Sequence, residues 1–337
     1  RLNRVPDSVY IKMLQMVGIE RLQASPAGTV VTITASRTDV SEVAVPAGTQ
    51  VAAAGDETGP VVFETLEPIS VLGTALQAVQ VWDGFSYMQS TVAAGVEGQR
   101  FYPFGPRARD GAALMLGFAG PAKMTSGLMH LYARIPAPDG PPNPDSRSDP
   151  DKVYDLPPPA EIVWEVFDAA TWQPGTAMRD ETDGFTRSGH IVLRGPGNAA
   201  KLATRGDVST PLYWLRARVK RGSWEKAPKL DAVLSNCVQV QQHVSHRNEV
   251  LVRSLCVPDQ TFTLSQTPVL PLRVPGTVIN TDGRVVEVKS LQLEIDEGQG
   301  PVVWQEVDDF LKSGPEYRHF MISYATGAVT FGMALRG

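Results

Sequence analysis

The chain has 337 residues, 42% of them hydrophobic and 20% charged, with a net charge of −5 and a pI near 5.6. This length allows two or three domains, each with its own core. The acidic balance argues against a nucleic-acid-binding protein, since phosphate contacts need clustered Lys and Arg, and no apolar run is long enough to span a bilayer.

The first predicted element is a helix at residues 7 to 17, between an Asp7 N-cap and Gly18. Its polar positions fall in a stripe only about 60° wide; they are Ser8, Lys12 and Gln15. A helix that is apolar nearly all round should be buried, either by the chain's own domains, by a preceding segment or by other subunits. Its candidate interface residues are Val9, Tyr10, Met13, Leu14, Met16 and Val17. The opening RLNRVPDSVY is typical of the middle of a protein sequence, so we expect the chain to be part of a longer one.

Most of the chain is predicted to form short β-strands between turns rich in Gly and Pro. Residues 128–135, 211–219 and 320–331 alternate apolar and polar side chains, and Ala325-Thr326-Gly327 predicts a hairpin turn in the last stretch. The apolar positions are Met129, Leu131, Ala133 and Ile135; Tyr213, Leu215, Ala217 and Val219; and Phe320, Ile322, Tyr324, Val329 and Phe331. Short alternating strands separated by turns rich in Gly and Pro are typical of β-sandwiches.

Two segments depart from the strand pattern. Residues 135–160 hold nine of the 27 prolines and few hydrophobic residues, which predicts a semi-rigid linker or surface loop. Near 305–312, the helical spacing of Val307, Phe310 and Leu311 before Gly314-Pro315 predicts a short helix.

The expected fold is therefore mainly β, with tandem sandwich-like modules, a short N-terminal helix and a Pro-rich linker or loop. We divide the chain into an N-terminal helix at 1–24, a first β module at 25–110, an inserted β-sandwich module at 111–222 and a return β module at 223–337. The inserted module contains the Pro-rich segment, and the return module contains the second helix.

The familiar sequence signatures of catalysis are missing. The chain contains no phosphate-binding G-x-x-x-x-G-K-[ST] motif and no G-x-S-x-G nucleophile elbow. Ser188 and His190 lie two positions apart at a predicted strand edge, where ordinary turn roles are the simpler interpretation. Paired carboxylates, such as Asp180-Glu181 and Asp308-Asp309, are common in any acidic protein. We therefore expect no catalytic residues and no enzymatic activity.

Four possible metal ligands fall within 20 residues: Cys237, His243, His246 and Cys256. On a strand, Cys237 and His243 would share one face and His246 would face the other way. The short C-x-x-C spacing of structural zinc sites is also missing. We expect no metal site and no cofactor, and we interpret both cysteines as buried free thiols.

A sugar-binding surface is the alternative from a different functional class. Tryptophans can form a platform for carbohydrate, and a glycosidase would add two flanking carboxylates. In a β-sandwich, however, a tryptophan is more often part of the core. We expect core positions for Trp164, Trp172, Trp214 and Trp224. The alternative function is a carbohydrate-binding or glycosidase-associated β-sandwich.

Several stretches, in the same order along nearly the whole chain, carry a resemblance to a known family. They are residues 1–27, VPAGTQVAA at 45–53, VVFETLEPI at 61–69, IVWEVFDAATWQPG at 162–175, DGFTRSGHIVLRGP at 183–196, YWLRARV at 213–219, residues 236–251, TFTLSQTPVL at 261–270 and residues 303–332. The chain resembles the baseplate assembly proteins of contractile injection systems, which are relatives of the phage baseplate J-like wedge proteins. Family members are longer at both ends, and the turn at 254–260 departs from the family's Gly-rich pattern.

The resemblance implies a structural wedge component that joins a central hub and spike to the contractile sheath. Its implied partners are other wedge subunits in a six-fold hetero-oligomeric assembly, met through a helical core bundle. It implies no cofactor, no nucleic acid and no membrane insertion. We expect the protein to be made in the bacterial cytoplasm and incorporated into a phage-like or injection particle.

Overall fold

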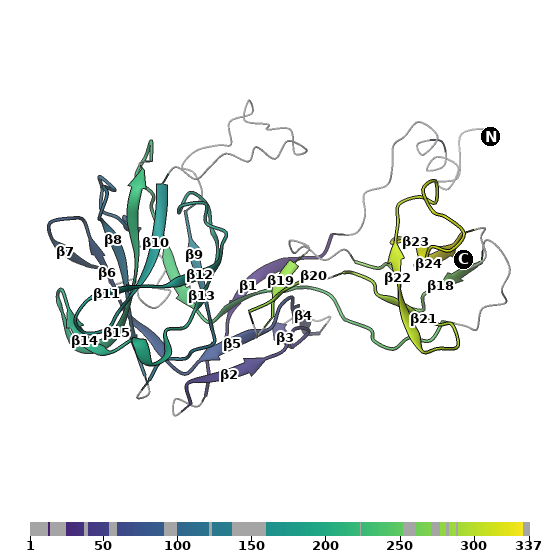
Figure 1. Ribbon diagram of the computed structural model, residues 1–337, viewed down its shortest axis with the longest axis horizontal. Helices are drawn as coiled ribbons and strands as arrows, with labels where there is room; N and C mark the ends of the chain where they lie inside the picture. The colour runs from purple at the N-terminus through teal and green to yellow at the C-terminus, as the bar shows by residue number, and fades with distance from the viewer. Residues whose placement is uncertain are drawn as a thin grey trace.

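The computed structural model describes residues 13, 25–36, 40–53, 59–90, 100–120, 123–136, 160–222, 224–251, 260–270, 277–280, 283–287 and 289–332. The elements formed there are β-strands and one 3-10 helix, Gly197–Ala199. The chain is therefore mainly β, as predicted. Figure 1 shows its strands gathered into three units along the long axis of the molecule.

The largest unit, which we call the sandwich, pairs a seven-stranded sheet with a four-stranded sheet. In order across the larger sheet, the strands are β11 (Trp172–Pro174), β10 (Ala160–Phe167), β15 (Val208–Gly222), β8 (Ala113–Ala119), β6 (Ala75–Trp82) and β7 (Tyr87–Ser90), with β14 (Leu202–Arg205) also pairing with β15. The smaller sheet contains β12 (Thr176–Asp180), β13 (Gly189–Arg194), β9 (Leu128–Arg134) and β16 (Ala232–Ser235). All neighbouring strands run antiparallel.

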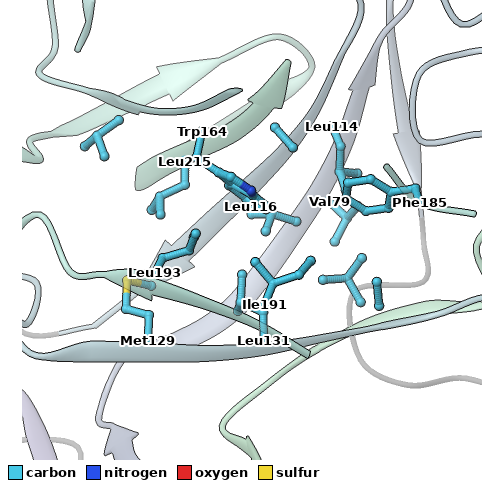
Figure 2. Close-up of a cluster of buried hydrophobic side chains, with 14 of the residues drawn as sticks. Val79, Leu114, Leu116, Met129, Leu131, Trp164, Phe185, Ile191, Leu193 and Leu215 are labelled. Atoms are coloured by element: carbon cyan, nitrogen blue, oxygen red, sulfur yellow. The ribbon is translucent and has the colours of Figure 1, made fainter. Parts of the chain in front are cut away.

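The main core lies between these two sheets. Figure 2 shows Trp164, Leu215 and Leu116 from the larger sheet facing Met129, Leu131 and Leu193 from the smaller one. The alternation predicted for β9 and β15 is confirmed, since the core contains Met129, Leu131 and Ala133 from β9 and Tyr213, Leu215, Ala217 and Val219 from β15. The same strands present their other side chains on the outer faces of the sandwich.

A second, smaller cluster covers the outer face of the larger sheet around Trp214, which is fully buried. The Trp214 indole donates a 2.8 Å hydrogen bond to the Ala203 carbonyl of β14. Gly117 on β8 pairs with Trp214, and a Cβ there would lie 2.9 Å from the indole ring. Glycine at 117 therefore allows the ring to lie against the sheet, where β14 covers it.

Two small sheets form another unit, which we call the first unit because the chain enters it before the sandwich. One has the order β1 (Gly28–Thr32), β17 (Cys237–Gln241), β4 (Val61–Thr65) and β3 (Gln50–Ala53); the other pairs β2 (Glu42–Val45) with β5 (Ile69–Leu72). Its core consists of Ile69, Val71, Val238 and Val240. Since β17 follows the sandwich in sequence, the chain leaves this unit, builds the sandwich and returns.

The C-terminal unit is a five-stranded sheet with its own core. Its order is β18 (Thr261–Thr263), β24 (Ala328–Phe331), β23 (His319–Ser323), β22 (Pro301–Glu306) and β21 (Leu293–Asp296), with β22 and β23 parallel. The predicted hairpin is confirmed as β23 and β24, which pair antiparallel. Its core residues are Trp304, Phe320, Val329 and Phe331.

A separate hairpin of β19 (Thr277–Ile279) and β20 (Val285–Glu287) belongs to neither of the flanking sheets. Ile279 packs with Leu128 and Val192 on the outer face of the sandwich's smaller sheet. The hairpin thus covers part of that outer face, although it lies far from β9 and β13 in the sequence.

The predicted helix near 305–312 is wrong. The β22 strand runs to Glu306, and the Val307 N–H then donates to the Phe320 carbonyl at 2.9 Å, which keeps the chain extended. The Leu311 N–H bonds the Asp309 side chain at 2.9 Å, so a local turn replaces a helical turn. Few residues remain between this turn and Gly314-Pro315. A helix that short would form too few hydrogen bonds to offset the cost of its nucleation.

Two further predictions fall outside the described residues. These are the helix at 7–17, of which only Met13 is described, and the Pro-rich segment, of which 137–159 are outside. The domain division stays a prediction, although hydrogen-bonded sheets join segments on both sides of its boundaries. For example, β6 pairs with β8, and β16 pairs with β9.

Candidate functional site: the junction between the first unit and the sandwich

The sequence-predicted interface residues are not tested by the structure. Val9, Tyr10, Leu14, Met16 and Val17 lie outside the described residues, and Met13 is 59% exposed. Their role at an interface stays a prediction.

Ser188 and His190 do not form a nucleophile and base. The Ser188 hydroxyl accepts a 2.9 Å hydrogen bond from the Ile135 N–H and lies 3.2 Å from the Ile135 carbonyl. The His190 ring is buried, and neither ring nitrogen has a hydrogen-bond partner in the described part of the chain. Ser188 therefore secures the end of the sheet, while His190 belongs to a different cluster.

The possible zinc ligands do not come together among the residues that can be placed. Cys237 is a buried free thiol that lies 3.3 Å from the Thr32 hydroxyl, and His243 instead lies 3.4 Å from the Glu64 carboxylate. His246 is exposed, and Cys256 lies outside the described residues. Within the described ranges, no group of three or more His, Cys, Asp or Glu side chains could hold a metal ion.

Two of the four tryptophans are fully in the core as predicted. Trp164 is 6% exposed and Trp214 is 0% exposed. Trp172 is half-buried, with the Arg216 guanidinium 4.2 Å from its ring centre. Trp224 is also half-buried; it stacks on Phe104 and donates a 2.7 Å hydrogen bond to the Gly184 carbonyl. Both half-buried rings are thus engaged by the protein itself.

The basic positions of β15 pair with carboxylates of β10. The Glu165 carboxylate accepts hydrogen bonds from Arg216 Nε at 2.6 Å and from Arg218 Nε and Nη2 at 2.9 Å. Burial would raise the pKa of Glu165, but the hydrogen bonds from Arg218 and Arg216 outweigh it and lower the pKa. Farther along, Lys220 and Arg221 both bond Glu161. These charges join two strands of one sheet.

The most buried charged cluster lies where the first unit meets the sandwich, and we call it the junction cluster: Glu67, His130, Arg179, Glu181 and His190. Four of its residues belong to the smaller sandwich sheet or follow one of its strands, whereas Glu67 lies in the turn between β4 and β5. In the sheet register, Val192 pairs with both His130 and Arg179, which places those two side chains on one face. This is the outer face, because the neighbouring residues Met129 and Leu131 point into the core.

An ion pair spans the junction. Arg179 Nη2 lies 2.6 Å from Glu67 Oε1, and Arg179 Nη1 lies 3.0 Å from Glu67 Oε2. Arg179 Nε is also 3.3 Å from Glu181 Oε1, an ion-pair distance. The side chains of Arg179 and Glu67 are 18% and 4% exposed, so the pair is shielded from water. Burial would lower the pKa of Arg179, but its hydrogen bonds and attraction to Glu67 raise it.

The two histidines of the junction cluster are neutral at physiological pH. Burial lowers the pKa of His130 to about 3, and the positive charge of Arg179 adds to that effect. Burial also lowers the pKa of His190, although Glu181 and Glu67 oppose the shift. No ring nitrogen of either histidine has a hydrogen-bond partner within the described ranges. The cluster joins the two units through the Arg179–Glu67 ion pair.

The junction cluster is not predicted by the sequence. His190 stands out there only beside Ser188, and no local pattern singles out Glu67, His130 or Arg179. Arg179 and Glu67 are 112 residues apart, so no local spacing predicts their contact. The sequence does show polar residues within the strands that flank the apolar core. This pattern indicates a polar contact, but it does not identify which residues form it.

No protein-family model and no curated protein matches this sequence. Among solved structures, the chain is similar to a chain of the type VI secretion system TssK-TssF-TssG baseplate subcomplex, determined by cryo-electron microscopy. The TM-score is 0.39 and the sequence identity is 13%, over 95% of this chain and 60% of that chain. The chain thus spans 60% of the length of its structural neighbour, and a likeness at this level does not establish a shared fold.

In the part of the chain that the structure describes, no helix has the length and apolar character needed to cross a membrane.

Proposed function

We propose that this protein is a non-catalytic structural component of the baseplate of a contractile tail or injection particle. The observation that carries the proposal is the row of three β units, each with its own core, seen in Figure 1. Such a row offers separate surfaces to several neighbours, as a scaffold requires. The ordered sequence resemblance to baseplate assembly proteins supports the same role.

The use of charged groups also fits a scaffold. Glu165 and Glu161 join neighbouring strands, Glu67 joins two units, and Glu297 bonds Arg318 within the C-terminal unit. Carboxylates held by arginines are poorly suited to proton transfer, because the positive partners favour their charged form. We infer that these groups contribute to mechanical cohesion of the chain.

We further propose, from the family resemblance, that the protein is a wedge subunit that links hub and spike proteins to the sheath. Its partners would be other wedge subunits in a six-fold hetero-oligomer, without nucleic acid or a cofactor. The protein would be made in the cytoplasm and incorporated into the particle. Contacts to partners would involve the residues around 7–17 as well as the β units.

Deleting the gene in its source cell and imaging the particles tests this proposal. We expect sheathed particles with complete baseplates to be lost, and to return when the full protein is supplied from a plasmid. Cryo-electron microscopy of the restored particles should then place the chain in the baseplate. Normal particles that lack the protein would refute a structural role.

A further inference from the structure

The junction cluster combines two features that make a contact sensitive to acid. Its ion pair joins the first unit to the sandwich, and its two histidines are buried beside that pair. His130 is 1% exposed and His190 is 4% exposed. Burying an imidazolium without hydrogen bonds is costly, so protonation of either ring requires that water reach it.

We propose that the contact between the first unit and the sandwich is a pH-sensitive junction, which loosens when His130 and His190 take up protons. The outer face that carries both rings meets the first unit, since Arg179 on that face pairs with Glu67 of the β4–β5 turn and β5 lies close to β9. Separation of the two units therefore brings water to His130 and His190. The sheets themselves need not unfold.

Burial decides the direction of the effect for both histidines, and the charges around them modify it. Arg179 from β12 repels an added positive charge on either ring, whereas Glu181, just after β12, and Glu67, from the β4–β5 turn, attract one on His190. On β9, Tyr132 contributes a neutral ring whose centre is 4.9 Å from that of His190. From β17, the Cys237 thiol is uncharged because burial raises its pKa to about 11. The strand β5, with sequence ISVL, adds no titratable group.

Linkage then fixes the pH range. Both histidines have a lower pKa in the closed junction than in water, so the open form binds more protons at pH values below about 6.5. For each histidine, the rise in the ratio of open to closed junction approaches about tenfold per pH unit when the pH is well below that value and above the histidine's pKa in the closed form. For His130 the rise continues down to a pH of about 3, its pKa in the closed form.

A thiol placed at the junction measures its opening. Ser70 lies in β5, is 7% exposed, and alternates with Ile69 and Val71, which point into the core of the first unit. In a background with Cys237→Ser and Cys256→Ser, Ser70→Cys introduces one thiol on the same face of β5 as Leu72, which packs in the sandwich core. We define the protection of the junction as a ratio of two labelling rates with a small alkylating reagent. It is the rate for a short peptide with the same cysteine at the same pH, divided by the rate for the thiol in the protein.

We expect the protection of the introduced thiol to fall about fivefold between pH 6.5 and 5.5 if one histidine takes up a proton, and about thirtyfold if both do. A thiol introduced by Val329→Cys, at a fully buried position of the C-terminal unit, should keep its protection over this range. His130→Phe combined with His190→Phe should remove the response, and His246→Gln, at an exposed position, should retain it.

Protection of the junction thiol that does not change with pH would overturn the proposal. So would an equal loss of protection in the C-terminal unit, or a response that survives replacement of both histidines. If the double histidine variant does not fold, hydrogen exchange at C2 of each imidazole in the unmutated chain, followed by mass spectrometry, gives the individual pKa values. A His130 that titrates near 6.5 while the junction stays protected would also refute the inference.

Discussion

Arg179 and Glu67, 112 residues apart in sequence, form a bidentate ion pair with nitrogen–oxygen distances of 2.6 and 3.0 Å. One residue belongs to the sandwich and the other to the first unit. Because the pair is shielded from water, removal of one partner leaves a buried charge. If Glu67 is replaced, Arg179 still has Glu181 at an ion-pair distance. If Arg179 is replaced, Glu67 loses both of these hydrogen bonds.

We expect Arg179→Leu to lower the free energy of unfolding by about 3–5 kcal/mol, the range for breaking a buried ion pair. Glu67→Leu should cost less, because Arg179 retains an acidic partner. Replacing both residues by Leu should cost less than Arg179→Leu alone. Urea denaturation followed by tryptophan fluorescence measures these changes, since Trp164 and Trp214 are buried in the sandwich.

The matched control is the Arg318–Glu297 pair, whose Arg318 side chain is 41% exposed. Exposed pairs contribute little to stability, so Arg318→Leu should barely change the unfolding curve. Equal effects of Arg179→Leu and Arg318→Leu would contradict the importance of burial at the junction.

The Cys237 thiol should be inert in the native protein. Burial raises the pKa of Cys237 to about 11, although the Thr32 hydroxyl opposes the shift. At pH 8 only about one thiol in a thousand would then be ionised, and the thiolate is the reactive form. In a Cys256→Ser variant, iodoacetamide should modify Cys237 only after urea is added, as measured by mass spectrometry. Rapid modification without urea would show that β17 opens readily.

The strand pattern of the sequence predicted the sandwich core well. In β9 and β15, one face is apolar at every second residue, and burial of that face determines the strand's orientation. The hairpin of β23 and β24 was predictable for the same reason, with Gly327 at its turn in a backbone conformation that favours glycine (φ 68°).

Other features depend on contacts that no local pattern encodes. The segment near 305–312 has helical spacing, yet it continues beside β23 because Val307 finds a backbone partner there. The junction cluster requires β5 to pack against β9, which only the complete topology determines. Tertiary contacts therefore overrode local preference in the first case and created the candidate site in the second.

The tryptophans should support the core and should not bind sugar. Trp214→Ala should lower the free energy of unfolding by about 3–5 kcal/mol, because it leaves a large cavity and removes the hydrogen bond to the Ala203 carbonyl. Trp172→Ala should cost less, since that ring is half-buried. Glycan arrays and fluorescence titrations with common polysaccharides should detect no saturable binding. Micromolar binding that disappears in a folded Trp172→Ala variant would instead support the carbohydrate-binding alternative.

The Pro-rich segment at 136–159 should be dispensable for folding. Its sequence offers little apolar surface to a core, and its prolines favour an extended chain in the folded and unfolded states alike. Replacing it with a short Gly/Ser linker should leave the thermal midpoint within a few degrees. A scrambled segment of equal length and composition is the matched control. A large fall in the midpoint with either variant would mean that the segment packs against a β unit.

The sequence at 7–17 gives the sharpest test of the proposed assembly. A helix there would have its polar positions within about 60° of its circumference, so it would need cover on most sides. We expect Leu14→Glu and Met13→Lys to block assembly of the baseplate, because each places a charge among apolar contacts. Gln15→Lys, on the polar stripe, adds a charge without that conflict and should assemble normally.

Each variant is supplied to cells that lack the gene, and the particles are counted by electron microscopy. Circular dichroism of the purified proteins should show unchanged β structure, which separates an assembly defect from misfolding. Complete baseplates formed by both Leu14→Glu and Met13→Lys would show that this segment is not an interface. Loss of assembly with Gln15→Lys as well would mean that any added charge is harmful there, and a buried apolar face would no longer explain the result.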